Sequence, residues 1–338
     1  MSSSKPLVAV VSGPGPALDL MPKDLPVEIM MVDGEDLGAQ AAKLSQAQGL
    51  LWIPTAGAPS SAPSDVLNRL WPMLSKVSWV HSFAAGVDGL KPFIDKSLKP
   101  AAEEGRVSLT NGRGAFSSSL AEYSLAAMLH FNKQLKRCEA NRAGRVWDNF
   151  VMDVMEDKTV GLVGYGSIGQ SCGRAAKGAF GCRVLALRRN AGDSSEGPAD
   201  EIFGFDDRLE FFKQCDYVIC SLPSTPLTQQ FVGEAELGAM KSSAVLISIG
   251  RGATIDEVAL EAALRGKKIH GAALDVFATE PLPVESGLWD CENLLLTAHN
   301  ADYTADYFEL GWKVWMENLD KFLQGKPLAT PVDLNAGY

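Results

Sequence analysis

The chain has 338 residues, of which 46% are hydrophobic and 21% charged, and its formal net charge is −10, a balance typical of a globular protein long enough for two domains. The basic residues form no dense tract and no apolar stretch approaches the roughly 20 residues that cross a bilayer, so we expect neither a nucleic-acid partner nor a membrane span. The six cysteines include no CxxC pair, which predicts reduced thiols, a cytoplasmic location and no metal site.

Short apolar segments alternate with helical segments along the chain, which predicts an α/β fold with parallel strands. In the first third, strands are predicted at residues 7–11, 27–32, 50–53, 77–81 and 107–109. Proline and glycine residues punctuate the gaps between them. This part of the sequence predicts a small α/β domain.

The next segment, residues 117–142, carries apolar residues at helical spacing and predicts one long amphipathic helix. A second α/β series follows, with a helix at 168–179 and strands at 159–163, 183–187, 217–221, 244–249, 270–274 and 294–297. The chain ends in a predicted helix at 302–323, whose apolar face carries Trp312, Trp315, Leu319 and Phe322.

A glycine-rich turn joins the first strand and helix of this second series. Gly164 permits a tight turn, Gly166 lets the backbone approach a pyrophosphate, and Gly169 lets the helix pack on the strand. Together with Ser167 and Ile168 at the start of the helix, the turn predicts a dinucleotide site, with the phosphates at the helix N-terminus.

The residues after the second strand of this series bear on the choice of cofactor. An NAD site normally has an acidic residue here, which accepts hydrogen bonds from the ribose hydroxyls. This chain has Arg188 and Arg189 instead, and guanidinium groups match the charge and geometry of a 2′-phosphate. The pattern favours NADP over NAD, although two solvated arginines at a strand end remain the alternative.

Three reactive side chains, Arg251, Glu280 and His299, follow three successive predicted strands. Parallel strands present their carboxyl ends at one edge, so we expect the three to face the cofactor. Reduction of a 2-oxo acid needs a hydride, a proton for the developing alkoxide and a cation for the carboxylate. His299 can donate the proton, Glu280 can orient the imidazole, and Arg251 can bind the carboxylate.

Each of the three side chains also has a purely structural interpretation. Arg251 can cap a helix, Glu280 can belong to a turn before a proline, and His299 can be a buried imidazole. The joint occurrence of all three after a dinucleotide-binding pattern favours the catalytic interpretation.

From about residue 74 almost to its C-terminus, the chain resembles the D-isomer-specific 2-hydroxyacid dehydrogenase family. The matching segments are WVHSFAAGVD at 79–88, LTNGRG at 109–114, AEY at 121–123 and CSLPSTPLT at 220–228. The resemblance implies a doubly wound Rossmann cofactor domain at 113–302. It also implies a smaller flavodoxin-like substrate domain at 1–112, completed by 303–338, and a homodimer formed through the cofactor domain. The 117–142 helix is a candidate interface, although core packing explains its apolar stripe equally well.

The resemblance also implies residue roles. The catalytic set is Arg251, Glu280 and His299, and the backbone amides of Ala85, Gly86 and Val87 hold the substrate carboxylate, with Arg251 and His299 also contacting the substrate. Further cofactor contacts are implied at Leu222, Pro223, Thr228, Ile249 and Gly250, and at Asp275 near the nicotinamide carboxamide.

Four positions depart from the family pattern without removing a catalytic group. Ala298 stands where a proline usually precedes the catalytic histidine, which removes a fixed φ that helps to hold the ring. Asn300 replaces the usual apolar residue after that histidine and is a candidate for tuning the substrate. Ser248 replaces a common asparagine, and Arg188 replaces the acidic ribose residue.

The leading hypothesis is an NADP(H)-preferring reductase that converts a small 2-oxo acid, glyoxylate or hydroxypyruvate, to the D-2-hydroxy acid. One alternative is a nucleotide-sensing regulatory protein on the same fold, which has no need of a placed acid. Another is a 3-phosphoglycerate dehydrogenase without its regulatory domain, although the sequence has no basic cluster near the carboxylate turn to receive a phosphate.

Overall fold

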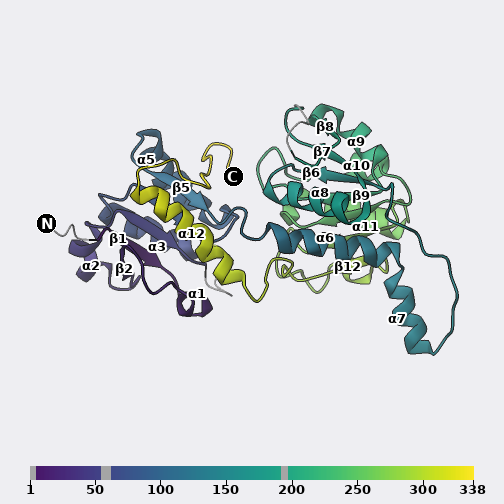
Figure 1. The fold of residues 1–338 in the computed structure, drawn as a ribbon, viewed down its shortest axis with the longest axis horizontal. Helices are drawn as coiled ribbons and strands as arrows, with labels where there is room; N and C mark the ends of the chain where they lie inside the picture. The colour runs from purple at the N-terminus through teal and green to yellow at the C-terminus, as the bar shows by residue number, and fades with distance from the viewer. Residues whose placement is uncertain (1–4, 55–61, 192–196) are drawn as a thin grey trace. The chain divides into compact units, whose positions relative to one another are not determined.

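The computed structural model describes residues 5–54, 62–191 and 197–338. The chain divides into two units (Figure 1): unit 1 consists of Met1–Phe116 and Ala305–Tyr338, and unit 2 consists of Ser117–Thr304. The boundaries expected after residues 112 and 302 therefore fall a few residues before those of the structure.

Unit 1 contains a five-stranded parallel sheet in the order β2-β1-β3-β4-β5, which is the flavodoxin-like order. All five predicted strands of this region are present, with small shifts at their ends. The strands are β1 (Leu7–Val11), β2 (Glu28–Met31), β3 (Gly49–Trp52), β4 (Trp79–Ser82) and β5 (Ser108–Asn111). The helices are α1 (Pro16–Asp19), α2 (Leu37–Leu44), α3 (Ala62–Leu70), α4 (Lys91–Phe93), α5 (Lys99–Glu103) and α12 (Tyr307–Leu323).

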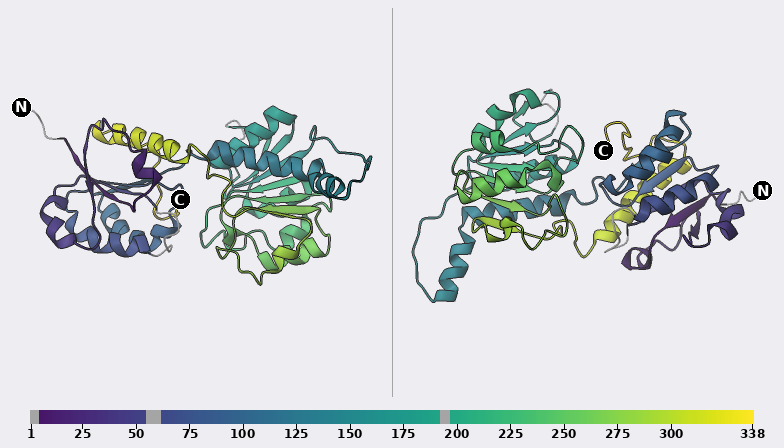
Figure 2. Two further views of the ribbon diagram at one scale, coloured as in Figure 1. Left: turned by 90° about the horizontal axis from the view of Figure 1, so that it is seen from below. Right: turned by 180° about the vertical axis from the view of Figure 1, so that it is seen from behind.

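Helices cover both faces of this sheet (Figure 2). Successive residues of a strand point to opposite faces. Leu7 and Ala9 of β1 belong to the cluster that includes the apolar residues of α2 and α3, whereas Val8 and Val10 pack in the cluster that includes α12. Both faces of the strand are therefore buried, which explains why β1 is an uninterrupted apolar run.

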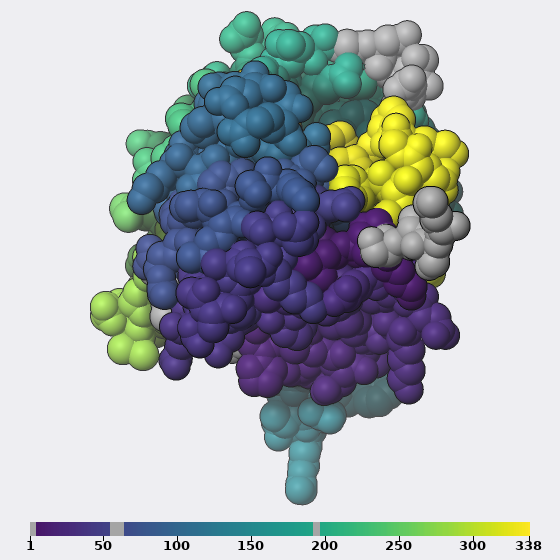
Figure 3. All heavy atoms as spheres, turned by 90° about the vertical axis from the view of Figure 1, so that its left-hand side faces the viewer, coloured from purple at the N-terminus to yellow at the C-terminus, as the bar shows by residue number. Residues whose placement is uncertain are grey.

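The C-terminal helix α12 completes the core of unit 1. Trp312, Trp315 and Leu319 are buried, as their spacing on one face predicts. The Trp315 ring stacks on that of Trp79 with 6.1 Å between centroids, and the Trp312 indole N–H donates to the Ala17 carbonyl at 2.8 Å. Unit 1 is thus built from both ends of the chain, and Figure 3 shows its C-terminal residues in yellow beside the N-terminal residues in purple.

Unit 2 contains a seven-stranded parallel sheet in the order β12-β11-β10-β9-β6-β7-β8. This is the classic Rossmann order extended by one strand, so the predicted fold class is confirmed. The strands are β6 (Thr159–Val163), β7 (Arg183–Leu187), β8 (Glu201–Phe203), β9 (Tyr217–Cys220), β10 (Val245–Ser248), β11 (Gly271–Leu274) and β12 (Leu294–Leu296). The helices are α6 (Ser117–Asn132), α7 (Leu135–Gly144), α8 (Ser167–Phe180), α9 (Arg208–Gln214), α10 (Glu234–Ala239) and α11 (Glu257–Arg265).

The prediction of a single helix over 117–142 is wrong. The chain breaks between α6 and α7, where Gln134 takes a left-handed conformation with φ 51°. The apolar residues of α6 are buried and α6 packs on α8, whereas α7 has no buried residue. Without an apolar face, no packing holds the second half in line with the first. The buried Asn132 at the end of α6 instead donates to the Val154 carbonyl at 3.3 Å.

All six cysteines lie in unit 2, and all are free thiols. Burial raises the pKa of Cys172 to about 11 and also raises the pKa of Cys182, Cys215, Cys220 and Cys291. Cys138 is partly exposed. In the part of the chain that the structure describes, no cluster of side chains could hold a metal ion, and no helix is long and apolar enough to cross a membrane.

Candidate active site

The glycine-rich turn lies between β6 and α8, as predicted. A Cβ atom on Gly169 would come within 2.1 Å of the Gly164 carbonyl oxygen, so a side chain there would push the helix off the turn. A Cβ on Gly166, by contrast, would meet no atom within 4 Å. Gly166 also provides no side-chain cap for the first N–H groups of α8. The open side of the turn and the uncapped helix N-terminus fit a pyrophosphate.

The other predicted cofactor residues follow four strands of the same sheet and therefore share its carboxyl edge. Arg188 and Arg189 come directly after β7, Leu222 and Pro223 after β9, Ile249 and Gly250 after β10, and Asp275 after β11. The Arg188 Nε atom donates to the Asn190 carbonyl at 3.1 Å, and Arg189 is exposed.

Thr228 is buried in the loop after β9. Its hydroxyl donates to the Pro223 carbonyl at 2.6 Å and accepts from the Thr225 amide at 2.9 Å. These bonds give Thr228 a structural role in shaping the loop, and its contact with a cofactor stays a prediction.

The structure brings His299 and Glu280 into direct contact. The Nδ1 atom of His299 lies 2.7 Å from Oε2 of Glu280, and the other carboxylate oxygen accepts from the Phe277 amide at 2.9 Å. Because the Nδ1–H group donates its hydrogen bond to the Glu280 carboxylate, Nε2 is the ring nitrogen available to a substrate.

The electrostatics of this pair favour a charged imidazolium beside a charged carboxylate. The hydrogen bond to Glu280 raises the pKa of His299; burial and the Arg251 charge oppose this rise, and the Asp302 charge adds to it. Burial works against ionisation of Glu280, but His299, the Phe277 amide and Arg251 outweigh it and lower the pKa of Glu280. Both shifts therefore favour the protonated imidazole, the form that a general acid needs.

Arg251 follows β10 and lies near the pair. Its Nη1 atom donates to the Gly250 carbonyl at 2.8 Å. A Cβ on Gly252 would come within 1.9 Å of the Phe277 backbone, so only glycine lets this strand end press against the segment that leads to Glu280. This close approach explains why the guanidinium charge lowers the pKa of both Glu280 and His299.

The loop that carries His299 is anchored on Asp275, whose side chain is buried. The Asp275 carboxylate accepts from the Thr297 hydroxyl at 2.6 Å and from the amides of Asn300 and Ala301, both at 3.1 Å. Its backbone carbonyl accepts from the His299 amide at 2.8 Å. This anchoring role of Asp275 was not predicted, and its only signal in the sequence is an aspartate at a strand end. The expected contact of Asp275 with a nicotinamide stays a prediction.

A hydroxyl pair extends this anchor into α6. The Tyr123 and Thr297 hydroxyl oxygens lie 2.8 Å apart. Because the Thr297 hydroxyl already donates its hydrogen bond to Asp275, the Tyr123 hydroxyl is the donor in this pair. Burial is the main reason that the pKa of Tyr123 is raised, to about 12. Neither hydroxyl was predicted to take part in the site.

The predicted carboxylate turn follows β4 in unit 1. Asn111 on β5 holds it by donating from Nδ2 to the Ala85 carbonyl at 2.6 Å. Within the described residues, the structure gives no hydrogen-bond partner to the backbone N–H groups of Ala85, Gly86 and Val87. These three donors have the chemistry that a carboxylate requires.

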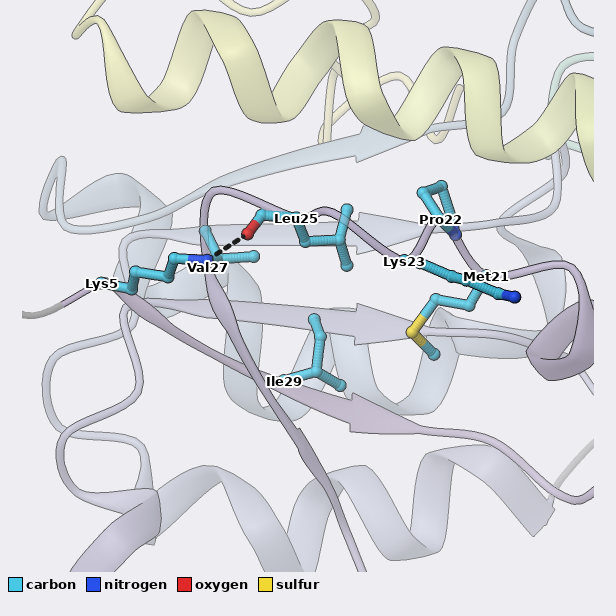
Figure 4. Close-up of a pocket in the computed structure, with 7 residues that line it drawn as sticks. All are labelled: Lys5, Met21, Pro22, Lys23, Leu25, Val27 and Ile29. Carbon is cyan, nitrogen blue, oxygen red and sulfur yellow. Dashed lines mark hydrogen bonds between the residues drawn. The ribbon is translucent and has the colours of Figure 1, made fainter.

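Unit 1 also has a surface hollow of about 440 Å³ (Figure 4). It is lined by Lys5, Met21, Pro22, Lys23, Leu25, Val27 and Ile29. The Lys5 ammonium donates to the Leu25 carbonyl at 2.8 Å. The lining has no carboxylate and no imidazole, so this hollow lacks the acid–base chemistry of the His299–Glu280 pair.

Comparison with known proteins identifies the family. The family model described as "D-isomer specific 2-hydroxyacid dehydrogenase, NAD binding domain" matches residues 125–301, which is more than half of the chain. The chain belongs to the D-isomer specific 2-hydroxyacid dehydrogenase family. The predicted family and enzyme class, that of NAD(P)-dependent oxidoreductases, are thereby confirmed.

Named relatives of this dehydrogenase include the glyoxylate/hydroxypyruvate reductase B of Yersinia pestis, 32% identical over 76% of this chain and 75% of the relative. A D-3-phosphoglycerate dehydrogenase of Methanocaldococcus jannaschii is 31% identical over 74% of this chain, but the match spans only 46% of that longer protein. Among solved structures, the NADPH-dependent glyoxylate/hydroxypyruvate reductase of Sinorhizobium meliloti, in complex with NADP and malonate, is 25% identical with a TM-score of 0.71, and the match covers 98% of each chain.

Proposed function

We propose that this dehydrogenase reduces a small 2-oxo acid, with glyoxylate and hydroxypyruvate as the leading substrates, to the D-2-hydroxy acid, and that it prefers NADPH. The observation that carries the proposal is the 2.7 Å contact between His299 Nδ1 and Glu280 Oε2, with Arg251 near enough to shift both pKa values. The Yersinia and Sinorhizobium relatives, whose names give these substrates, support it.

The glycine turn of Gly164, Gly166 and Gly169 would hold a nicotinamide cofactor by its pyrophosphate, and that cofactor would supply the hydride for the 2-oxo carbon. His299 then delivers a proton from Nε2 to the oxygen of the developing alkoxide, and Glu280 stabilises the imidazolium until that transfer. Arg251 binds the substrate carboxylate and polarises the 2-oxo group. The family resemblance also predicts carboxylate-binding donors in unit 1, the backbone amides of Ala85, Gly86 and Val87.

A panel of 2-oxo acids tests the substrate class. We expect NADPH oxidation with glyoxylate or hydroxypyruvate, and slower turnover of 3-phosphohydroxypyruvate. The reverse order of rates would favour a phosphoglycerate dehydrogenase, which is the name of the Methanocaldococcus relative. Nucleotide binding without turnover of any acid would favour a nucleotide sensor, against which the paired His299 and Glu280 already argue.

The cofactor preference depends on the cations after β7. We expect Arg188→Asp to lower the NADPH-to-NADH ratio of kcat/KM by about 10- to 100-fold, because a hydrogen bond to a charged group is worth about 1.5–3 kcal/mol and the new carboxylate repels a 2′-phosphate. Arg183→Asp makes the same charge change at the other end of β7 and serves as the control. If the NADPH-to-NADH ratio of kcat/KM stayed at the wild-type value in both Arg188→Asp and Arg189→Asp, these two arginines would not determine the cofactor preference.

The pH dependence of reduction tests the His299–Glu280 pair. Reduction needs the imidazolium, so kcat/KM is constant below the pKa of His299 and falls as the pH rises through it. Glu280 is the largest cause that raises this pKa; Asp302 also raises it, and Arg251 lowers it. Glu280→Gln should therefore move the falling limb to lower pH. The exposed Glu285 on the same loop provides the control variant, Glu285→Gln, and a limb that moves equally in both variants would contradict the pairing.

We also propose that the dehydrogenase is a homodimer formed through unit 2. Figure 1 shows α7 and the chain after it extending away from the sheet of that unit. This arm exposes Val146, Trp147, Val151 and Val154, and Trp147 is 98% exposed. It is braced internally, since the Arg137 guanidinium lies 4.1 Å from the Phe150 ring centroid. Exposed apolar residues clustered on a braced arm are typical of an interface.

Light scattering during gel filtration checks this proposal. We expect the wild-type chain to elute as a dimer, and Trp147→Glu to shift it toward the monomer because a charge would be buried at the interface. Trp289, which is 51% exposed elsewhere in unit 2, offers a matched control in Trp289→Glu. A wild-type monomer, or equal shifts in both variants, would rule out this interface.

A further inference from the structure

We propose that Asn300 is a positioning residue, which holds the catalytic loop through the backbone of Ala298. The Oδ1 atom of Asn300 accepts a hydrogen bond from the Ala298 amide at 3.0 Å. The bond therefore spans His299, whose ring makes the contact with Glu280. This inference rests on the proposed role of His299 as the proton donor.

The backbone of His299 explains why such a bond is needed. Its φ is +53°, in the left-handed region that few residues other than glycine adopt. The residues on either side, Ala298 and Asn300, are exposed, so no burial of their side chains enforces this conformation. The hydrogen bond from the Ala298 amide to the Asn300 side chain closes a short ring that contains the strained backbone of His299.

Of the five backbone amides in 297–301, four donate to residues outside the loop, and the Ala298 amide donates to a side chain within it. The Thr297 amide donates to the Leu274 carbonyl at 3.0 Å, in line with the strand. The amides of His299, Asn300 and Ala301 all donate to Asp275. Asp275 therefore holds the amides of residues 299–301, and Asn300 holds the amide of Ala298, which Asp275 does not bind.

The bond also links two of the departures from the family pattern. A proline before the catalytic histidine has a fixed φ and no N–H, so it needs no acceptor nearby. Ala298 has a free φ and an N–H, and the residue two positions later supplies the acceptor. We infer that Ala298 and Asn300 act as one compensating pair, in which a hydrogen bond replaces the rigidity of a ring.

A double-mutant cycle tests this inference in the full-length enzyme. Asn300→Leu keeps the approximate size of the side chain and removes the acceptor. We expect it to lower kcat for glyoxylate about fivefold with little change in KM, the effect of losing one hydrogen bond. In the Ala298→Pro background, where no N–H remains, the same substitution should lower kcat less than twofold.

Hydrogen exchange gives a second readout that requires no turnover. The amides of residues 299–301 should exchange faster in Asn300→Leu than in the wild type, and should regain protection in Ala298→Pro/Asn300→Leu. Asn300→Asp retains an acceptor oxygen and should keep wild-type protection, which covers the case in which Asn300→Leu does not fold.

Two results would overturn the inference. One is an equal loss of kcat on Asn300→Leu in both backgrounds. The other is a change in the glyoxylate-to-hydroxypyruvate ratio of kcat/KM with wild-type exchange, which would make Asn300 a substrate contact instead. If the wild-type enzyme reduced no 2-oxo acid, the proposed function would fail, and the exchange measurements would still decide whether Asn300 restrains the loop.

Discussion

Replacing His299 with glutamine should lower kcat for reduction of the 2-oxo acid by about 100- to 10,000-fold, the usual contribution of a general acid. Glutamine can donate a hydrogen bond from the same place, but it cannot give up a proton. The dinucleotide turn lies after a different strand and is untouched, so NADPH should bind with wild-type affinity. Single-turnover kinetics and a fluorescence titration with NADPH separate the two effects.

The matched control for this variant is His270→Gln. His270 is an exposed histidine just before β11, and its ring contacts the side of Phe131 and not a carboxylate. We expect its kcat to stay near the wild-type value. If His299→Gln also retained wild-type kcat, the proton would have to come from another group, and the proposed mechanism would be wrong.

The second large effect is expected at Arg251. Arg251→Gln should lower kcat/KM by about 100- to 1,000-fold, because it removes the charged donor that we propose binds the substrate carboxylate. Since the Arg251 charge lowers the pKa of His299, the variant should raise that pKa further, and the imidazole should stay protonated. The loss would therefore come from carboxylate binding and polarisation, not from an unprotonated acid.

Arg251→Lys separates charge from geometry. Lysine keeps the charge but lacks the planar fork that binds a carboxylate through two bonds, so we expect an intermediate kcat/KM. Initial rates over a range of glyoxylate concentrations would measure both variants. An Arg251→Gln variant with unchanged KM and kcat would show that the guanidinium has only a structural role.

Much of the architecture could be predicted from local patterns. The predicted bounds of β6 and β7 agree with the structure because each is a buried apolar run that ends at a charged or glycine-rich turn. The glycines before α8 were interpretable because a turn between a strand and a helix permits few arrangements. The proximity of Arg251, Glu280 and His299 could be predicted because they follow strands whose carboxyl ends must share one edge, and their catalytic roles stay a prediction.

What could not be predicted depends on contacts distant in sequence. The break at Gln134 follows from the loss of packing partners beyond α6, which the helical spacing does not reveal. β8 has three residues and none is buried, so it leaves almost no pattern. The bonds from Asp275 to the histidine loop join residues more than twenty positions apart, and no local signal in the sequence marks them.

The placement of the thiols has a practical consequence. Five of the six are sealed in the interior of unit 2 and stay protonated at neutral pH, so a thiol-specific reagent reaches them only when that unit opens. Unit 1 contains none. Under native conditions, the rate of the slow phase of alkylation would therefore report the opening of unit 2 alone. Added NADPH should lower this rate if the bound dinucleotide stabilises the closed form of unit 2.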